Sequence, residues 1–427
     1  MSDQATFNAK HYAPPRDYSD KNYVVFLPLL HFVVGLWIFS GGFVLIEPSP
    51  YELLFALVLP IAMVARVGVY KETLSLLAII ILFIPFAIIS AFQATFFSLS
   101  ESLIYISITS FLFLTAFFLA NYIADAPFNR MKVVMGAYLA IALITAIIGT
   151  LAYLKLIPGE EIFLRYDRAK AFFKDPNVYG PFLILPAMFM LQKLFFVKLN
   201  KAFFPAIFFG ILAIGVFASF SRAAWGSLLF AAILLFGLSF TLIANAKEKV
   251  HMIILALVGG AVGIVALLGL LSIPEVNKLF VERFSLVQSY DGGSTGRFGR
   301  QAYAFELAIE NPLGIGPGEF ASMRIKEEPH NTYVNNMLVY GWGGGLAFFF
   351  MFVLTLKRGI GVLYKKSKNR VLMIPLIATF IPLVIEAAII DINHWRHLFL
   401  ITGLIWGVSA GYFKISKRQI KEKHLLI

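Results

Sequence analysis

The sequence predicts an all-α protein that crosses a membrane about twelve times and carries one large extracytoplasmic loop containing an amphipathic helix. Of the 427 residues, 59% are hydrophobic and only 14% are charged, whereas an ordinary soluble domain is about 25% charged. The apolar residues form continuous runs, most of them near the length of ~20 residues that crosses the hydrocarbon layer. Only helices satisfy every backbone hydrogen bond inside such runs, because a lone strand in lipid has no partner.

Twelve apolar runs divide the chain into five parts. Residues 1–23 form a polar amino-terminal tail, and residues 24–273 hold spans one to nine. Residues 274–332 form the large loop, residues 333–413 hold spans ten to twelve, and residues 414–427 form a basic tail. The runs lie at 24–46, 51–66, 74–92, 103–123, 132–154, 178–196, 201–218, 224–245, 250–273, 333–356, 371–390 and 396–413.

The distribution of lysine and arginine predicts the orientation. With the amino terminus inside, 23 of the 36 basic residues fall on the cytoplasmic side, and 11 of the other 13 fall in two long loops. Short cytoplasmic loops are enriched in Lys and Arg, so both termini are expected inside and both long loops in the periplasm. Much of the net charge of +12 is therefore explained by the lysines and arginines that set the membrane orientation. For this reason we expect no nucleic-acid partner.

The two long outer loops, 155–177 and 274–332, contain Lys and Arg against this preference, which indicates an anionic ligand on the outer side. Within the larger loop, "STGRFGRQAYAFELAIENP" predicts a helix capped by Ser294 or Thr295 and stopped by Asn311-Pro312. An apolar stripe of Phe298, Ala302, Phe305 and Ile309 makes this helix amphipathic, so it lies on the bundle or at the membrane interface. The following "PLGIGPGEF" lacks the Lys-Ser/Thr ending of a phosphate loop and predicts only a tight turn.

Several arginines on the outer side are candidate anion ligands. Arg222 lies at the junction of two apolar runs, where it either binds an anion or extends to lipid headgroups. Arg165 and Arg168 precede the turn "DPN", and Arg297 and Arg300 share one side of the predicted helix. Converging guanidinium groups suit a pyrophosphate. The alternatives are a solvated basic loop and surface arginines beside lipid phosphates.

His330 is the candidate acid–base group, because an imidazole takes up a proton near neutral pH without a metal. The alternative is a structural histidine beside a helix start. A second outer segment, "DINHWRHLF", contains Asp391, His394, Arg396 and His397. It lacks a HExxH pattern and the chain has no cysteine, so we predict no metal site and no cofactor.

Four stretches occur in the order "FKDPNVYGPFL", "SFSRAAW", "STGRFGRQAYAFELAIENPLGIGPGEF" and "EEPHNTYVNNMLVYGWGGGL". Across about residues 165–350 they resemble the O-antigen ligase and polymerase superfamily of bacterial envelope glycosyltransferases. The resemblance implies transfer of a glycan from an undecaprenyl-pyrophosphate carrier to a sugar hydroxyl on the periplasmic face of the inner membrane, with inversion and without a metal or nucleotide. The implied partners are this lipid-linked donor, a lipid A-core or glycan acceptor, and membrane lipids.

The resemblance also implies roles for particular residues. The arginine of the family's Ser-Arg motif matches Arg222, its loop Gly-Arg arginine matches Arg297, and its loop histidine matches His330; these three are the expected catalytic residues. We assign Arg300, Arg168, Arg165, Asn331 and Arg396 to substrate binding. Ala171 departs from the family pattern, since many members have glycine there.

Three classes of function remain open at this stage. A ligase that transfers the glycan to lipid A-core is preferred, and a polymerase that extends the repeat chain is the alternative within the family. A flippase or exporter of lipid-linked glycan is the rival from another class, but it needs ionisable residues across its spans rather than at one side. A structural assembly protein has no need of converging Arg and His.

Overall fold

A computed structural model describes residues 21–46, 48–284, 293, 296–323 and 327–424 of the chain. The described residues are mainly helical, with one two-stranded antiparallel hairpin in which Arg165 pairs with Arg168. The elements in chain order are α1 (Lys21–Ser40), α2 (Pro50–Val64), α3 (Leu74–Ala91), α4 (Leu99–Asp125), α5 (Pro127–Tyr153), β1 (Leu164–Arg165), β2 (Arg168–Ala169), α6 (Pro176–Phe182), α7 (Ile184–Phe196), α8 (Phe203–Ala218), α9 (Arg222–Leu242), α10 (Ala246–Leu271), α11 (Pro274–Phe284), α12 (Arg297–Glu310), α13 (Glu319–Met323), α14 (Thr332–Leu363), α15 (Arg370–Glu386) and α16 (Arg396–His424).

Every predicted apolar run coincides with a helix, and the run at 178–196 is divided between α6 and α7. Among the described residues, seven helical segments are long and apolar enough to cross a membrane. They are Lys71–Ala91, Leu99–Asp125, Pro127–Tyr153, Pro176–Phe196, Arg222–Leu242, Ala246–Leu271 and Thr332–Leu363. The all-helical class is therefore confirmed, while the count of twelve spans and the division of the chain into five parts stay predictions.

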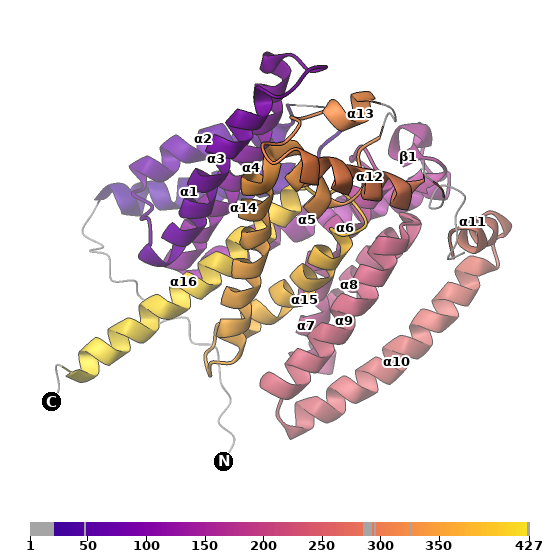
Figure 1. The fold of residues 1–427 in the computed structure, drawn as a ribbon. Coiled ribbons are helices and arrows are strands. Elements are labelled where there is room, and N and C mark those ends of the chain that lie inside the picture. Colours follow the sequence, from indigo (N-terminus) through magenta and orange to yellow (C-terminus); the bar gives the residue numbers. More distant parts are fainter. Residues whose placement is uncertain (1–20, 47, 285–292, 294–295, 324–326, 425–427) are drawn as a thin grey trace.

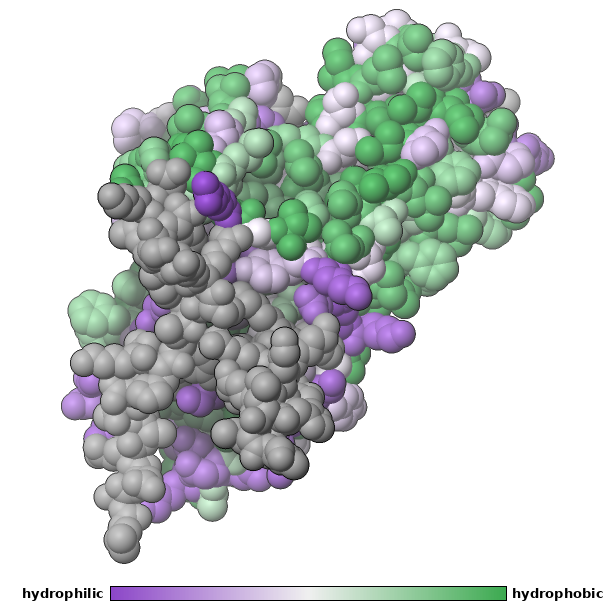
Figure 2. Space-filling view, turned by 90° about the vertical axis from the view of Figure 1, so that its left-hand side faces the viewer, coloured by the Kyte–Doolittle hydropathy of each residue, from purple (hydrophilic) through white to green (hydrophobic). Residues whose placement is uncertain are grey.

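The elements of the two long loops gather at one end of the bundle. Figure 1 shows β1, α11, α12 and α13 at the top, whereas the α9–α10 and α14–α15 connections lie at the bottom. Figure 2 shows apolar side chains over the upper part of one face and hydrophilic ones gathering in its lower part. The elements of both long loops thus share one end of the bundle, and the side of the membrane that this end faces stays a prediction.

Close packing of α16 along α4 fixes the segment that precedes α16. Gly403 and Gly407 lie four residues apart on the face of α16 that meets α4. A Cβ added to Gly403 would lie 2.6 Å from the carbonyl oxygen of Ala116, and one on Gly407 would lie 2.8 Å from that of Ala120. Small residues at this spacing let two helix backbones approach closely in a membrane, and the start of α16 is thereby held at the upper end.

A break in α14 anchors the large loop. Gly341 adopts φ 70° and ψ 178°, which interrupts the helix. The glycine-rich loop fills the opening, because the amide of Ile315 donates to the carbonyl of Leu338 at 2.9 Å and that of Trp342 donates to the carbonyl of Pro312 at 2.9 Å. The prediction of a tight turn was thus incomplete, since this loop supplies the hydrogen bonds that α14 loses at its kink and seats α12 over α14.

Glu319 of α13 provides a second anchor. Its side chain is 1% exposed and accepts hydrogen bonds of 2.8 Å from the amides of Phe96 and Phe97 and from the hydroxyl of Thr95. A buried carboxylate with three donors is stably held. It ties the large loop to the α3–α4 connection, so the loop is fixed at two places.

Candidate functional site

One cavity of about 1200 Å³ opens among the elements at the upper end of the bundle. The β1–β2 hairpin, the α8–α9 junction, the start of α12 and the segments before α14 and α16 all contribute to its wall. Seven of the eight residues predicted for the site line it, namely Arg165, Arg168, Arg222, Arg297, Arg300, His330 and Arg396. Segments that are up to 231 positions apart in sequence therefore meet at one place.

The hairpin presents Arg165 and Arg168 by means of a tight turn. Tyr166 and Asp167 both have positive φ, at 54° and 56°, which matches the right-handed twist of a two-residue hairpin. Arg168 is 7% exposed and donates to the carbonyl of Ser219 at 2.8 Å and to the carboxamide oxygen of Asn177 at 2.8 Å. Arg168 therefore ties the hairpin to the α8–α9 junction.

Arg165 is more exposed and faces the turn before α6. Its guanidinium lies 3.2 Å from the carboxylate of Asp175, which caps α6. Ala171, where many members of the resembled family have glycine, adopts φ 46°. Only glycine takes up this left-handed conformation without a steric penalty. The backbone at position 171 therefore explains why many members of the resembled family have glycine there.

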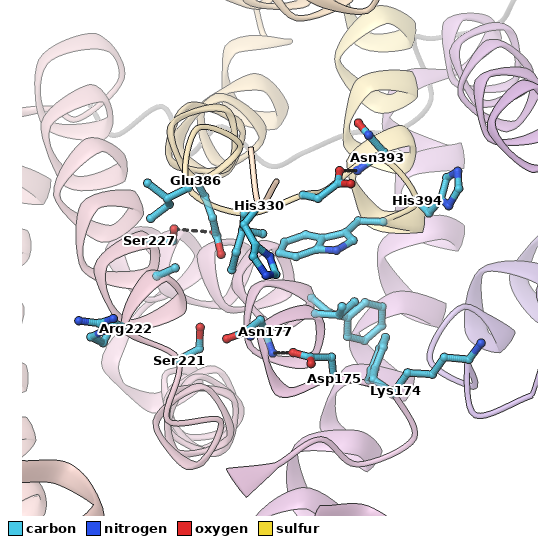
Figure 3. A pocket seen from close by; sticks show the side chains of 18 of the residues that line it. Lys174, Asp175, Asn177, Ser221, Arg222, Ser227, His330, Glu386, Asn393 and His394 are labelled. Atoms are coloured by element: carbon cyan, nitrogen blue, oxygen red, sulfur yellow. Dashed lines mark hydrogen bonds between the residues drawn. The ribbon is translucent and has the colours of Figure 1, made fainter. Parts of the chain in front are cut away.

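Arg222 is the first residue of α9 and follows a strained junction. Phe220 has φ 43°, and the hydroxyl of Ser221 accepts a hydrogen bond from the amide of Ala224 and caps the helix. Figure 3 shows Arg222 at the edge of the site and well separated from His330. The first turn of α9 points the partial positive charge of its helix dipole to the same end as the arginines.

Arg297 and Arg300 begin α12. Arg300 is 7% exposed and forms an ion pair with Glu327. The predicted helix ends at Glu310 before Asn311-Pro312, and its cap position is Gly296. The two residues predicted to cap it, Ser294 and Thr295, lie outside the described residues.

The predicted apolar stripe of α12 faces outward. Phe298, Phe305 and Ile309 are 57%, 48% and 51% exposed, whereas the buried face consists of Arg300, Ala304 and Ala308. The small alanines allow close packing against α14. Of the two predicted positions, lying on the bundle or at the interface, the exposed stripe favours the interface.

His330 lies in the short segment between α13 and α14. It adopts φ 54°, and its carbonyl accepts a hydrogen bond from the side chain of Gln301 at 3.0 Å. Its Nε2 atom is 3.6 Å from a carboxylate oxygen of Glu327. Burial, with Arg297 and Arg300 nearby, lowers the pKa of the imidazole below its usual 6.5, although Glu327 acts in the opposite direction. His330 is therefore neutral at pH 7, the state of a proton acceptor.

Two predicted ligands have other contacts. Asn331 does not line the cavity; its carboxamide oxygen accepts hydrogen bonds from the amides of Tyr333 and Val334 and caps α14. Arg396 lines the cavity but donates to the carboxylate of Glu52 at 2.9 and 2.6 Å. Asn331 immediately precedes the first residue of α14, a position at which asparagine is a preferred helix cap.

No acidic residue was among those predicted to bind substrate or act in catalysis, and Asp391 was considered only for a metal site. Glu327, Glu328, Glu386 and Asp391 nevertheless all line the cavity. Burial and the neighbouring Asp391 raise the pKa of Glu328 to about 7. Burial alone would raise the pKa of Glu327, but the Arg300 guanidinium and His330 hold it below its usual value. Glu386 carried a usable signal, since a lone acid in a predicted span is expensive and marks a functional position.

The described residues contain no group of three or more His, Asp and Glu side chains that could hold a metal ion. His394 contacts the hydroxyl of Thr109 through Nε2 at 2.9 Å, whereas His397 packs on Trp395 and Phe182. The absence of a metal site in the whole chain stays a prediction.

Residues 207–349 match a family model described as O-antigen ligase. The matched segment includes Arg222, Arg297, Arg300 and His330, whereas the hairpin with Arg165 and Arg168 lies before it. No curated protein matches the chain at a significant level. The resemblance to the O-antigen ligase superfamily seen in the sequence is thereby confirmed over residues 207–349.

Proposed function

We propose that the protein transfers a glycan from an undecaprenyl-pyrophosphate carrier to a sugar hydroxyl of an acceptor, on the periplasmic face of the bacterial inner membrane. The observation that carries this proposal is that arginines from the hairpin and from the starts of α9, α12 and α16 line one cavity together with a neutral histidine. The preferred acceptor is lipid A-core, which makes the protein an O-antigen ligase.

In the proposed reaction, the acceptor hydroxyl oxygen attacks the anomeric carbon of the donor glycan. A new glycosidic bond forms, and the bond between the anomeric carbon and the pyrophosphate oxygen breaks, with inversion. The hydroxyl proton passes to His330, and undecaprenyl pyrophosphate leaves with the bonding electron pair. The step requires no redox partner and no metal.

The arginines stabilise the leaving group. Arg222 and Arg297 come from different segments, so they bind the two phosphates of a pyrophosphate from different sides. Fixed cations in a site that excludes water stabilise the negative charge that develops in the transition state, which is often the largest contribution to catalysis. Arg165 adds positive charge from the hairpin, and Arg168 holds that hairpin in place.

His330 is suited to accept the proton. Its lowered pKa keeps the imidazole unprotonated at neutral pH, and general-base catalysis of this kind contributes about 10²–10⁴-fold. Its positive φ places the ring at a fixed angle before α14, and strain of this sort persists where the surroundings enforce it.

A polymerase that extends the repeat chain would use the same site with a different acceptor, so the distinction depends on which acceptor is elongated. The flippase alternative is disfavoured by position, because the charged residues of the cavity come from one end of the bundle. A carrier of lipid-linked glycan needs polar groups along the whole path across the membrane.

The test is a reaction with purified protein, an undecaprenyl-pyrophosphate-linked glycan and lipid A-core lacking O-antigen, in the presence of EDTA. We expect glycan to appear on the acceptor. Elongation of the lipid-linked donor with no modification of lipid A-core would identify a polymerase. Movement of the donor across a vesicle membrane without any new glycosidic bond would exclude a transferase and favour the flippase.

A further inference from the structure

The cavity has two walls of opposite chemistry. The arginine wall comes from the hairpin, the start of α9 and the start of α12. The acidic wall comes from the segments before α14 and before α16 and from the end of α15. In Figure 3, Glu386 lies beside His330 and Asn393 lies above it, while Ser221 and Asn177 lie below it. His330 belongs to the segment before α14, and the acidic wall adds no cation that could hold a pyrophosphate.

Polar atoms on the acidic wall have no partner within the described part of the chain. One carboxylate oxygen of Glu386 accepts from the hydroxyl of Ser227 at 3.0 Å, but the other, Oε1, is buried and has no hydrogen bond. Glu386 itself is only 3% exposed. Figure 3 shows its side chain directed into the cavity from the end of α15. A buried carboxyl oxygen without a donor is costly, so this atom is suited to a donor brought by a ligand.

Two further groups on this wall repeat the pattern. Oε2 of Glu328 is buried without a hydrogen bond to any described residue, and so is Nδ2 of Asn393. The carboxamide oxygen of Asn393 accepts from Asn336 at 2.8 Å, which fixes the orientation of that amide. Asp391 differs, because Asn335 and the amide of Asn393 satisfy both of its oxygens. Asp391 is therefore a support for this wall.

The chemistry of these groups matches an uncharged sugar. Two carboxyl oxygens accept hydrogen bonds and one amide donates, and a sugar hydroxyl can both donate and accept. The indole of Trp395 also lines the cavity and packs beside His397 at a ring distance of 5.2 Å. A flat aromatic surface is suited to the apolar face of a pyranose ring, whereas these four side chains offer a phosphate no cation.

We propose that Glu386, Glu328, Asn393 and Trp395 form a subsite that binds an uncharged sugar of the acceptor through its hydroxyl groups. This subsite rests on the proposed function and assigns the donor and the acceptor to opposite walls. The acceptor hydroxyl is thereby delivered to His330 from the acidic side, and the pyrophosphate from the arginine side.

The experiment is steady-state transfer by Glu386→Gln and Glu328→Gln, with donor and acceptor varied in turn. Glutamine keeps the size of the side chain but replaces one acceptor oxygen by an amide. We expect the KM for the acceptor to rise at least about tenfold, the loss that follows removal of a hydrogen bond to a charged or buried group, and the KM for the donor to stay unchanged. Glu306→Gln, an exposed substitution on α12, is the matched control.

Other patterns overturn the subsite. If the KM for the acceptor is unchanged in both variants, the subsite does not exist. If only the KM for the donor rises, Glu386 belongs to the donor site. If only kcat falls, Glu386 acts as an acid–base group. Because Glu386 is buried, Glu328→Gln on the segment before α14 serves as the second variant if the first one unfolds. A wild-type protein that transfers no glycan counts against the proposed function.

A binding measurement keeps the subsite testable in that case. The protein is titrated with core oligosaccharide released from lipid A-core, and its tryptophan fluorescence is measured. The part of the signal that is absent in Trp395→Phe is assigned to Trp395. Quenching in the wild type that weakens at least about tenfold in Glu386→Gln supports the subsite. A titration that is the same in the wild type and in Glu386→Gln, or no Trp395 signal at saturating sugar, overturns it.

Discussion

Glu327 places a carboxylate oxygen 3.6 Å from Nε2 of His330 and pairs at the same time with the guanidinium of Arg300. The carboxylate therefore stands between the arginines of α12 and the proposed base. Its contact with the ring fixes which nitrogen faces the carboxylate and leaves Nδ1 for the acceptor. It also raises the pKa of His330 against the lowering by burial and by the two arginines.

Glu327→Gln is expected to move the acid limb of the pH–rate profile to lower pH. The base works only when it is unprotonated, so activity falls as the pH drops through the pKa of His330, which lies below 6.5. Loss of the carboxylate lowers this pKa further, because only the arginines remain as charged neighbours. The measurement is kcat/KM between pH 5 and pH 8, with the exposed Glu310→Gln as control. A limb that stays in place or moves to higher pH contradicts the pairing.

His330→Ala is expected to lower kcat by about 10²–10⁴-fold, the usual contribution of a positioned base, and to leave donor affinity unchanged. His330→Gln separates two roles, because glutamine hydrogen-bonds but cannot accept the proton. If the glutamine variant turns over at a near-normal rate, His330 positions the acceptor only. If the alanine variant does so, the residue is structural.

Arg222→Ala and Arg297→Ala are each expected to lower kcat/KM at least about a hundredfold, the cost of removing one fixed group that stabilises the leaving oxygen. Arg→Lys should restore little, because a point charge lacks the planar fork. Lys278→Ala, an exposed basic substitution on α11, is the matched control. Amounts of inserted protein are compared by immunoblot, and full activity of both alanine variants at equal amounts would exclude the arginine clamp.

Gly341→Ala is expected to destabilise the seating of the large loop. The backbone there has φ 70° and ψ 178°, a region that essentially only glycine adopts, at a cost of about 1–3 kcal/mol for other residues. An added Cβ would also lie 2.5 Å from the carbonyl oxygen of Pro312. The readouts are Tm and proteolysis within 274–332. Gly361→Ala in the same helix meets no atom within 4 Å and should be neutral; equal effects of both substitutions contradict the anchoring role.

Reporter fusions test the orientation predicted from the basic residues. Fusions after Lys201 and after Lys365 should report the cytoplasm, and a fusion after Lys278 should report the periplasm. The fold places Lys278 on α11 at the end of the bundle where the cavity opens. A cytoplasmic signal from Lys278 would falsify the periplasmic assignment of the site.

The candidate site was largely predictable as a set of residue types. Arginines in outer segments are conspicuous because they oppose the distribution that directs insertion, and His330 is conspicuous because it precedes a membrane helix. The acidic wall was not predictable in the same way. Glu328 lies two residues before His330, but nothing in the sequence indicates that it is buried. Glu386 lies near the end of an apolar run, and the sequence does not indicate which way its side chain points.

The sequence by itself determined that the chain is helical and rich in apolar runs long enough to cross a membrane. The length of an apolar run and the distribution of charge are local properties that do not depend on the tertiary structure. It also indicated which outer segments contain arginine and lysine. Only the tertiary structure decided that the hairpin, the α8–α9 junction, α12 and the segment before α16 meet at one cavity. The contacts that bring them together, such as the Arg168 side chain with the Ser219 carbonyl and the glycine-rich loop with the kink at Gly341, join atoms far apart in sequence. Such contacts depend on packing, which has no periodicity that a sequence displays.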